Sequence, residues 1–380
     1  MANETTHILI AAPLYPPEIG GPATYVKMLE TELAGSAITL TIVPFSSVRG
    51  WPKGIRHLIY TWKLWRRAWG ADFVYALDPV SVGVPAFVAS VLSRRALWVR
   101  LGGDYAWEQG VQRFGLTATL DEYTSAPKQA ARAVRFLAAV ERHIVKRAKR
   151  VIVPSHYLAT VVRTWGVDPK RLTVIYSALN PLPKTLNRIE ARAKLGAAGP
   201  VLLSAGRLVP WKGFPALVQV IARLRDMYPE IRLYIAGSGP DEAELRKEID
   251  TMNLSEQIIL LGRVSKDMLS EYVNAADVFV LNTAYEGLSH VLLEVIDSGI
   301  PVVTTTVGGN PELVKDGESG ALVAYNDIDA LTDRINELLA DTTLATRLSS
   351  NAKQQLEQFT TATVVKQFME LTAKENTEKL

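Results

Sequence analysis

Ten short, continuously apolar runs recur along the chain, and longer segments with the spacing of amphipathic helices separate them. Because each run is apolar throughout rather than at every second residue, it is typical of a parallel strand that is buried on both faces. Strands that alternate with helices in this way predict an α/β fold with doubly wound parallel sheets. The runs are HILIAA, ITLTIV, FVYAL, ALWVRL and RVIVPS in the first half, and PVLLSAG, IRLYIAG, QIILLG, DVFVLN and IPVVTT in the second.

The chain has 380 residues, which is more than one hydrophobic core ordinarily organises, so two domains are expected. A break lies in NPLPKTLNRIEARAKLGAAGP, where prolines precede a short polar helix and a Gly/Pro turn. We therefore expect an N-terminal Rossmann-like domain over residues 1–180, a linker over 181–198 and a C-terminal Rossmann-like domain over 199–360. A terminal helix within 361–380 is expected to pack back on the N-terminal domain.

Positive charge is concentrated in the first half of the chain. Residues 1–180 hold 22 Lys and Arg against 12 Asp and Glu, whereas residues 181–380 hold 20 against 27, so the halves carry net charges of +10 and −7. A basic half of this kind fits nucleic acid, an anionic acceptor or an anionic membrane surface.

The sequence contains no cysteine and no uncharged run long enough to span a membrane. Its first residues, MANETTHILIAAPLYPPEIGG, lack the basic segment of a secretory signal peptide. We therefore expect a cytoplasmic protein that is soluble or peripheral on the inner face of the membrane.

Two glutamates lie eight positions apart in YEGLSHVLLEVIDSGIPVV, residues 285–303. Eight helical residues rise about 12 Å, which is too far for two carboxylates that act on one glycosidic bond. If a helix begins at Gly287, Glu286 precedes it, Glu294 lies two turns inside it, and its first amides attract a phosphate. The glutamates would then hold two parts of one elongated ligand. The alternative is that Glu286 only favours the helix dipole and Glu294 is a solvated helix residue.

Two further loops follow predicted strands, at the edge of a parallel sheet where ligands bind. The first strand leads into Gly20 and Gly21, which let the backbone approach a phosphate closely; a purely structural turn is the alternative. The first strand of the second domain leads into SAGRLVPWKGF, which brings Arg207 and Lys212 into one loop. Two fixed cations there could neutralise a diphosphate leaving group without a metal, although surface cations are also common.

Other chemistries find little support in the sequence. The segment IAGSGPDEAEL lacks the third glycine of a dinucleotide fingerprint. The five histidines are scattered without metal-binding spacing, and no G-x-S-x-G nucleophile elbow is present. The sequence therefore predicts neither a nicotinamide cofactor nor a bound metal.

Taken in order, several motifs resemble those of glycosyltransferase family 4, whose members are retaining enzymes of the GT-B fold. The resemblance extends from residue 8 to about residue 340, and the motifs of the second domain are the more specific. It implies two Rossmann-like domains that face each other across a cleft. The motifs are GGPATYV, GRLVPWKGF, IAGSGPDEAEL, LGRV, YEGLSHVLLEVIDSGIPVVTT and VGGNPELVKDGESGALV.

The resemblance also implies a role for each matching residue. Gly20 and Gly21 would line the donor phosphates, and Arg207 and Lys212 would stabilise the departing diphosphate. The donor is then a nucleoside-diphosphate sugar, and neither a cofactor nor an obligatory metal is implied.

For the two glutamates, the resemblance implies that Glu286 contacts the transferred sugar and that Glu294 binds the ribose. Eight residues then separate them because a nucleotide sugar is long and each end needs its own hydrogen-bond acceptor. Five more residues would complete the donor site: Gly287, Leu288 and Ser289 beside the sugar and phosphate, and Arg263 and Val264 beside the base.

Two departures from the family's pattern stand out. Many members carry a His-containing loop on the acceptor side of the first domain, whereas this chain has RLGGDYAWE, with Asp104 and no histidine. We expect Asp104 to act as a catalytic group near the acceptor. The Asn-Gly-Val-Asp segment that usually follows the last strand of the first domain is SALN here, residues 177–180.

The sequence therefore predicts a retaining, metal-independent glycosyltransferase. It would move a hexose-type sugar from a UDP or GDP sugar to a hydroxyl of a glycan or lipid-linked acceptor, with Glu286 positioning the sugar rather than attacking it. The alternatives are a GT-B epimerase of sugar nucleotides, a phosphorylase, or a non-catalytic partner subunit. The presence of Arg207, Lys212, Glu286 and Glu294 disfavours the last of these, and nucleic acid is not an expected partner.

Two basic amphipathic segments in the first half indicate a surface for an anionic membrane. The segment GIRHLIYTWKLWRRAWG sets Trp62, Trp65 and Trp69 three and four residues apart among four cations, which suits a helix at the lipid interface. The second segment is KQAARAVRFLAAVERHIVKRAKR, residues 128–150. The alternative is that the apolar stripe of each helix packs in the core of its domain.

Overall fold

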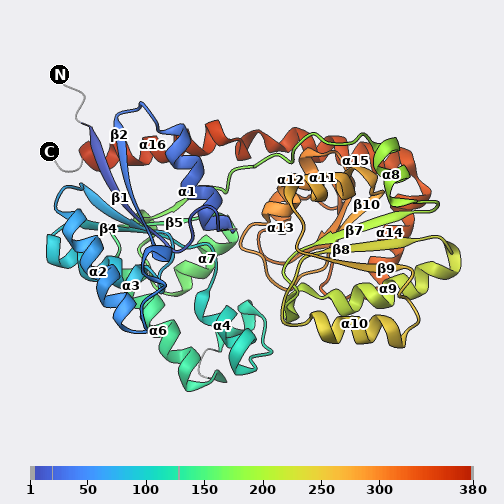
Figure 1. Cartoon of the computed structure of the whole chain (residues 1–380), viewed down its shortest axis with the longest axis horizontal. Coiled ribbons are helices and arrows are strands. Elements are labelled where there is room, and N and C mark those ends of the chain that lie inside the picture. The colour runs from blue at the N-terminus through green and yellow to red at the C-terminus, as the bar shows by residue number, and fades with distance from the viewer. Residues whose placement is uncertain (1–4, 19, 127–128, 378–380) are drawn as a thin grey trace. The chain divides into compact units, whose positions relative to one another are not determined.

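The computed structural model describes residues 5–18, 20–126 and 129–377 of the chain. Within these ranges the chain forms two compact units, each built on its own six-stranded parallel sheet (Figure 1). The first unit holds the residues up to Ala178 together with those from Phe359 onward, and the second runs from Leu179 to Gln358. The prediction of two Rossmann-like domains is confirmed, whereas the cleft expected between them stays a prediction.

In the first unit the strand order is β2-β1-β3-β4-β5-β6, so the direction in which strands are added reverses between β1 and β3. The four inner strands are buried almost throughout, as their continuous apolar runs predict, whereas the edge strands β2 and β6 are mostly only partly buried. They are β1 (Thr6–Ala12), β2 (Ile38–Pro44), β3 (Phe73–Ala76), β4 (Ala96–Arg100), β5 (Arg150–Val153) and β6 (Leu172–Val174).

The helices of this unit cover both faces of the sheet (Figure 1). Helix α1 (Gly21–Glu32) packs with α16 (Thr361–Thr377) on one face, and α2 (Ile55–Ala68), α3 (Gly83–Ser93) and α6 (Arg132–Arg147) pack side by side on the other (Figure 1). Further elements are η1 (Phe45–Val48), α4 (Tyr105–Phe114), α5 (Leu120–Ser125), α7 (His156–Thr164) and η3 (Pro169–Arg171).

Aromatic side chains join α16 to the first sheet. The ring of Phe73 stacks on that of Trp98 with centroids 4.2 Å apart, and the ring of Phe368 from α16 stacks on that of Tyr75 at 5.7 Å. All four side chains are fully buried. The terminal helix expected within 361–380 therefore contributes core residues to the first unit, as far as its residues are described; residues 378–380 lie outside the described part.

In the second unit the strand order is β12-β11-β10-β7-β8-β9, and the reversal lies between β7 and β10. The strands are β7 (Val201–Ala205), β8 (Arg232–Ala236), β9 (Ile258–Gly262), β10 (Val278–Leu281), β11 (Val302–Thr305) and β12 (Ala321–Val323). The helices are α8 (Arg188–Leu195), η4 (Pro210–Lys212), α9 (Phe214–Met227), α10 (Glu242–Thr251), α11 (Lys266–Ala275), α12 (His290–Asp297), α13 (Asn310–Leu313), α14 (Ile328–Ala340), α15 (Thr342–Gln354) and η5 (Gln355–Phe359). Among the described residues, no helix of either unit combines the length and the apolar character that a membrane crossing requires.

The segment 181–198, which we expected as a linker, belongs to the second unit. Asn187 and Glu190 form a capping box that starts α8, and Arg192 of this helix pairs with Asp277 at 2.9 Å. The hydroxyls of Thr185 and Ser270 also lie 3.1 Å apart. The prolines and glycines of this segment therefore mark the ends of a packed helix rather than a free connection, and the linker prediction is wrong.

Candidate functional site

The reversal of strand order in the second sheet lies between β7 and β10, and the loops after both strands leave the sheet at its carboxyl edge. Ligands of open α/β sheets bind at such a reversal, because the two loops diverge there and leave room between them. The loop after β7 carries Arg207 and Lys212, and the loop after β10 carries Glu286. The fold therefore brings the predicted leaving-group cations and the predicted sugar-contacting carboxylate to one edge of the sheet.

The Nζ of Lys212 donates a hydrogen bond to Oε1 of Glu286, and the two groups form an ion pair. Their side chains are only 12% and 15% exposed, so water screens this pair less than it would a surface pair. The pair joins the loops of β7 and β10 directly.

A hydrogen-bonded network holds the turn that carries Lys212. Gly213, at φ 54°, follows this turn, and a Cβ there would collide with Asn282. The Nδ2 of Asn282 donates to the carbonyl of Gly213 at 2.9 Å and to Oδ1 of Asn326 at 2.8 Å. The hydroxyl of Tyr325 donates to the carbonyl of Pro210 at 3.1 Å. The position of Lys212 is thus fixed by residues that the sequence gave no reason to select.

The loops after β7 and β8 pack backbone against backbone. The amide of Leu208 donates to the carbonyl of Ser238 at 3.2 Å, and a Cβ on Gly239 would meet the carbonyl of Leu208 at 2.0 Å. Glycine is therefore required at 239 for close packing, although the motif is not a dinucleotide fingerprint. Arg207 is exposed beside these loops. Next to them, Nε of Arg263 donates to Oγ of Ser238 at 3.0 Å, and Val264 is half-buried after Arg263.

Helix α12 begins at His290 rather than at Gly287, and Ser289 is its N-cap. The start expected at Gly287 is therefore wrong, because the hydroxyl of Ser289 accepts a hydrogen bond from the amide of Leu292 and ends the preceding loop there. Among the described residues, none accepts a hydrogen bond from the amides of Gly287, Leu288 or Ser289. These amides remain available to an anion, although they belong to the loop before the helix.

The glycines of VGGN hold the loop of Glu286 in place. The amide of Gly309 donates to the carbonyl of Glu286 at 2.9 Å. A Cβ on Gly308 would collide with the same carbonyl, and one on Gly309 would lie 2.5 Å from the carbonyl of Gly287. The sequence contained the signal for this contact, a Gly-Gly after a strand, but offered no way to identify its partner.

Glu294 lies inside α12 and pairs with Lys266, whose Nζ is 2.7 Å from Oε1. Lys266 also donates to the carbonyl of Asn180 at 3.3 Å. Burial raises the pKa of Glu294, and the hydrogen bond from Lys266 opposes that rise. The carboxylate is thus mostly buried and already held by a cation, rather than being the solvated residue of the alternative interpretation.

In the first unit, Gly20 and Gly21 follow β1 at the reversal between β1 and β3. Gly20 caps α1 with φ 153°, Gly21 is the first residue of the helix, and Pro22 follows in its first turn. A Cβ on Gly20 would lie 2.7 Å from Cδ1 of Leu14. Glycine is therefore needed for the turn itself, and a role toward phosphates stays a prediction.

Asp104 is fully buried, and its Oδ1 accepts a hydrogen bond from the amide of Trp107 at 2.8 Å as the N-cap of α4. The equally buried Glu141 accepts hydrogen bonds from the amides of Tyr105 and Ala106 at 3.1 and 3.0 Å. Burial raises the pKa of Asp104 to about 6, and burial together with the charge of Asp104 raises that of Glu141 well above its usual range. Sequence reasoning missed Glu141. Direct contact of Asp104 with an acceptor stays a prediction, and its observed contacts are those of a helix cap.

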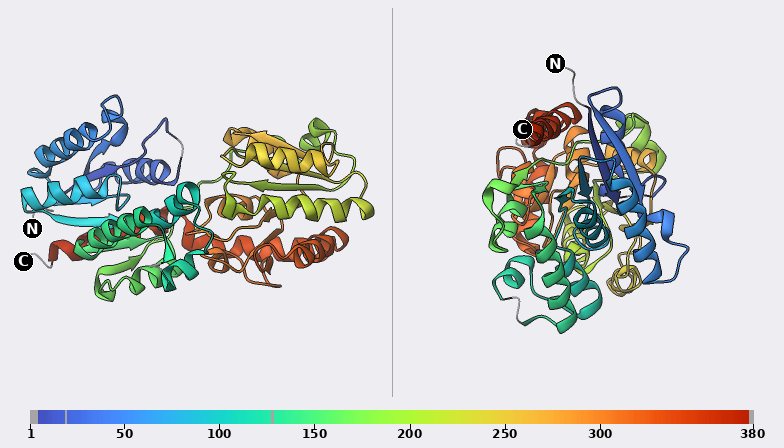
Figure 2. Two further views of the ribbon diagram at one scale, coloured as in Figure 1. Left: turned by 90° about the horizontal axis from the view of Figure 1, so that it is seen from below. Right: turned by 90° about the vertical axis from the view of Figure 1, so that its left-hand side faces the viewer.

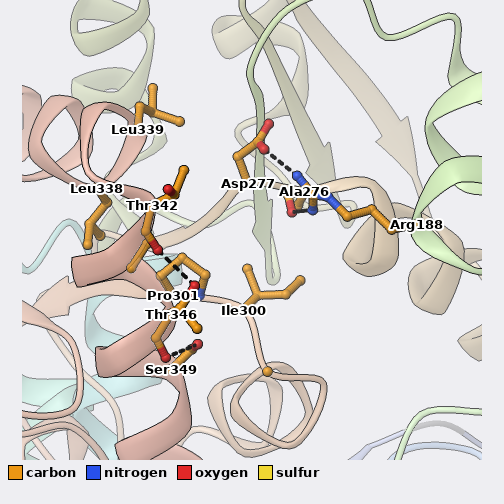
Figure 3. Close-up of a pocket in the computed structure, with 12 residues that line it drawn as sticks. Arg188, Ala276, Asp277, Ile300, Pro301, Leu338, Leu339, Thr342, Thr346 and Ser349 are labelled. Atoms are coloured by element: carbon orange, nitrogen blue, oxygen red, sulfur yellow. Dashed lines mark hydrogen bonds and ion pairs between the residues drawn. The ribbon is translucent and has the colours of Figure 1, made fainter.

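Two other kinds of site were considered. Within the described residues, no group of three or more His, Cys, Asp or Glu side chains could hold a metal ion. A pocket of about 280 Å³ lies at the amino-terminal edge of the second sheet, where Asp277 and Pro301 line it just before β10 and β11 (Figure 3). The Thr346 hydroxyl in its wall donates to the carbonyl of Thr342 at 2.7 Å, so this polar group is satisfied within the protein. The pocket lies at the opposite edge of the sheet from Lys212 and Glu286.

Two family models match the chain, and together they cover most of both units. Residues 29–178 match the model described as glycosyl transferase 4-like domain, and residues 187–355 match the model described as glycosyl transferases group 1. A lipopolysaccharide core biosynthesis glycosyltransferase, LpsE of Rhizobium meliloti (strain 1021), is 33% identical over 185 residues, which are 48% of this chain and 53% of that protein.

A second relative is a GDP-mannose-dependent alpha-(1-6)-phosphatidylinositol monomannoside mannosyltransferase of Mycolicibacterium smegmatis (strain ATCC 700084 / mc(2)155). It is 33% identical over 183 residues, 46% of each chain. The chain thus spans about half the length of the curated relatives it matches.

Among solved structures, HepE of Anabaena in complex with UDP and glucose has a TM-score of 0.76 at 21% identity, covering 96% of this chain and 99% of that one. Sucrose-phosphate synthase of Thermosynechococcus elongatus has a TM-score of 0.79 at 21% identity, covering 98% and 100%. These likenesses show the fold, and the model that matches residues 187–355 covers the motifs of the second unit. This chain belongs to glycosyltransferase family 4.

Proposed function

We propose that this protein is a retaining glycosyltransferase that moves a hexose-type sugar from a UDP or GDP sugar to a hydroxyl of a glycan or lipid-linked acceptor. The observation that carries the proposal is the Lys212–Glu286 pair at the strand-order reversal of the second sheet. Arg207 lies in the same loop as Lys212. One site thus combines cations suited to a diphosphate with a carboxylate suited to sugar hydroxyls.

These residues fit a reaction in which the charge develops on the leaving group. The bond between the anomeric carbon and the diphosphate oxygen breaks, and Lys212 and Arg207 stabilise the negative charge that grows on the diphosphate. The acceptor oxygen bonds to the anomeric carbon on the same face, and its proton passes to the departing phosphate oxygen. Glu286 accepts hydrogen bonds from the sugar and orients it. The two cations supply the charge neutralisation that a metal would otherwise provide.

At the other end of the donor, we propose that Glu294 accepts hydrogen bonds from the ribose and that Arg263 and Val264 lie beside the base. Glu294 and Lys212 follow different strands on the same edge of the sheet, which suits an elongated ligand. The amides of residues 287–289 would bind phosphate or sugar between the two ends. In the first unit, Gly20 and Gly21 would approach the donor phosphates.

The names of relatives support the acceptor class. LpsE is named for lipopolysaccharide core biosynthesis, and the relative from Mycolicibacterium smegmatis for a phosphatidylinositol mannoside. Both names point to glycolipid acceptors. We propose accordingly that the protein works in the cytoplasm, at the inner face of a membrane that carries such an acceptor.

A donor screen tests the proposal. Thermal shift measurements with UDP, GDP and ADP sugars should identify one base, and calorimetry should then give its affinity. With an acceptor extract, release of the nucleoside diphosphate and NMR of the product should show transfer with retained configuration. Failure of every nucleotide to bind would contradict the proposal.

The same screen separates the alternatives. Conversion of the donor into a second sugar nucleotide without acceptor would indicate an epimerase, and release of a sugar 1-phosphate from a glycan by phosphate would indicate a phosphorylase. Binding without turnover under any condition would indicate a non-catalytic partner subunit. Lys247→Ala, which removes an exposed cation of the same unit, is the matched control for variants of the site.

A further inference from the structure

We infer that the helix layer formed by α2, α3 and α6 in the first unit docks on an anionic membrane surface. The inference rests on the proposed function in one respect, because a lipid-linked acceptor places the enzyme at a membrane. The structural argument concerns the helix layer alone. It uses the packing of the three helices, the exposure of their apolar side chains and the distribution of their charges.

The three helices form one continuous layer. Helix α3 packs against both α2 and α6, and the rings of Phe87 on α3 and His143 on α6 meet edge to face with centroids 5.8 Å apart. All three cover the same face of the sheet (Figure 2), as right-handed crossovers in this strand order would place them. Two segments that are far apart in the sequence thus contribute to one surface, and α3 lies between them.

Large apolar side chains of this layer point away from the core. Isolated apolar side chains are common on protein surfaces, but a group of them on one layer marks an interaction site. Trp65, which the sequence placed in the same stripe, is half-buried and contributes less. Six side chains are each at least half exposed: Leu58, Trp62 and Trp69 on and after α2, Val91 and Leu92 on α3, and Phe136 on α6.

The charges of the layer have a single sign. The three helices contain one carboxylate, Glu141, and it is fully buried. Exposed cations lie on α2 and α6, and the guanidinium of Arg66 lies 5.0 Å from the ring centroid of Trp62. The exposed cations are Arg66 and Arg67 on α2, and Arg132, Arg135, Lys146 and Arg147 on α6.

Aromatic and aliphatic side chains among unopposed cations are the composition that binds an anionic lipid interface. A second copy of the chain that docked through the same layer would bring positive charge against positive charge, which is unfavourable. Nucleic acid would satisfy the cations but offers no apolar phase to Leu58, Val91 or Leu92. An anionic membrane satisfies both features. Lys128, the first residue of the predicted basic run, lies outside the described residues.

Co-sedimentation with vesicles tests the inference. Wild-type protein should pellet with vesicles of phosphatidylcholine that contain phosphatidylglycerol, remain in solution with phosphatidylcholine alone, and dissociate at high salt. Removing Arg66, Arg67 and Arg135 together (R66Q/R67Q/R135Q) should weaken binding by about fivefold for each cation. Trp62→Ala with Trp69→Ala should also weaken it and abolish the blue shift of tryptophan fluorescence on vesicle binding.

Matched variants on the second unit keep the test specific. R223Q/R246Q/K247Q removes the same charge from exposed positions, and Ile189→Ala with Met227→Ala removes exposed apolar groups. These variants should bind vesicles as the wild type does; equal losses in both sets would indicate unspecific charge attraction and overturn the inference. The inference would also be overturned if the wild-type protein stayed in solution with anionic vesicles at low salt. A dimer in solution that the double variant Trp62→Ala with Trp69→Ala dissociates would overturn it as well. Calorimetry with UDP and GDP reports the proposed function separately, so intact nucleotide binding without vesicle binding would contradict this inference alone.

Discussion

At the scale of single residues, Lys212 and Glu286 have two roles: they stabilise each other, and they are proposed to contact the ligand. Both are mostly buried, and removing one partner of such a pair leaves the other charge without compensation. Part of any loss on mutation is therefore structural. Arg207 in the same loop is exposed and forms no ion pair within the part of the chain that the structure describes. Its substitution therefore separates the effect on catalysis from the effect on the fold.

We expect Arg207→Ala and Lys212→Ala each to lower kcat by about 100-fold or more, because each removes stabilisation of the charge that develops on the leaving diphosphate. Release of nucleoside diphosphate measures the loss. Arg207→Ala should keep the Tm of the wild type, whereas Lys212→Ala should lower it. Unchanged turnover in both variants would exclude these cations from the site.

The two glutamates should affect different steps. Glu294→Ala should weaken binding of the free nucleoside diphosphate by about tenfold or more, since it removes a hydrogen bond that a charged group makes to the ribose. Glu286→Ala should leave that affinity nearly unchanged and slow sugar transfer. Calorimetry with the nucleotide and kinetics with the sugar donor measure the two effects, and equal loss of affinity in both variants would contradict the division.

The buried pair of Asp104 and Glu141 should make the stability of the first unit depend on pH. The pKa of Asp104 is raised to about 6, above the value of about 3.9 in an unfolded chain. The native state therefore holds this proton more tightly, and its contribution to stability is present at pH 4 and lost as the pH rises through about 6. The loss is about 3 kcal/mol at most.

Urea denaturation at pH 5 and pH 7 tests this, with Asp104→Asn as the comparison. Asparagine keeps the N-cap acceptor for the Trp107 amide but carries no charge. The wild type should lose stability relative to Asp104→Asn as the pH rises, because Asp104 and its neighbour Glu141 influence each other's pKa. Carboxylates outside this pair contribute equally to both proteins. Parallel changes in the two proteins would show that the pair does not titrate in this range.

At the scale of secondary-structure elements, the ten apolar runs all form strands, because a strand that packs in a covered parallel sheet needs a continuous apolar run that is visible in the sequence. The two strands that the sequence did not reveal, β6 and β12, have three residues each and lie at the sheet edges. Three residues cannot show a pattern. Each of these strands forms because it pairs with a neighbouring strand, and that neighbour can be identified only in the folded structure.

The start of α12 could have been read from the sequence, since Ser289 is a preferred N-cap and Gly287 is not required at a first turn. The contact of Glu141 with the start of α4 could not, because 36 residues separate Glu141 from Tyr105 and only the tertiary structure brings them together. The same holds for Gly309 and Glu286. The sequence motifs were enough to locate the site, but the structure was required to identify the residues that hold its loops in place.

Helix α16 offers a test at this scale. Its Phe368 is fully buried and packs on Tyr75 and Trp98, so Phe368→Ala should lower the free energy of unfolding of the first unit by about 3–5 kcal/mol. Met369→Ala, at a partly exposed position of the same helix, is the control. Chemical denaturation measures both, and equal small losses would mean that α16 does not contribute to the core.

At the scale of the whole molecule, the chain leaves the first unit at Ala178, builds the second, and returns at Phe359. Each unit has its own core: one cluster surrounds β1 and β3 and includes Phe368, and the other joins α9 and α14 to the second sheet. The first unit contains the basic half of the sequence, and the second unit carries most of the proposed donor contacts. Stability and binding should therefore be separable along the same division.

Calorimetric unfolding should accordingly show two transitions, and a nucleoside diphosphate should move only that of the second unit. At 100 times its dissociation constant, a ligand adds about 2.7 kcal/mol to the unit that binds it, which raises the Tm of a unit of this size by about 5–10 °C. Phe368→Ala should lower only the other transition. If the nucleotide and the mutation moved one common transition, the units would unfold together and the donor contacts could not be assigned to the second unit by this means. If the nucleotide moved only the transition that Phe368→Ala lowers, the proposed placement of the donor on the second sheet would be wrong.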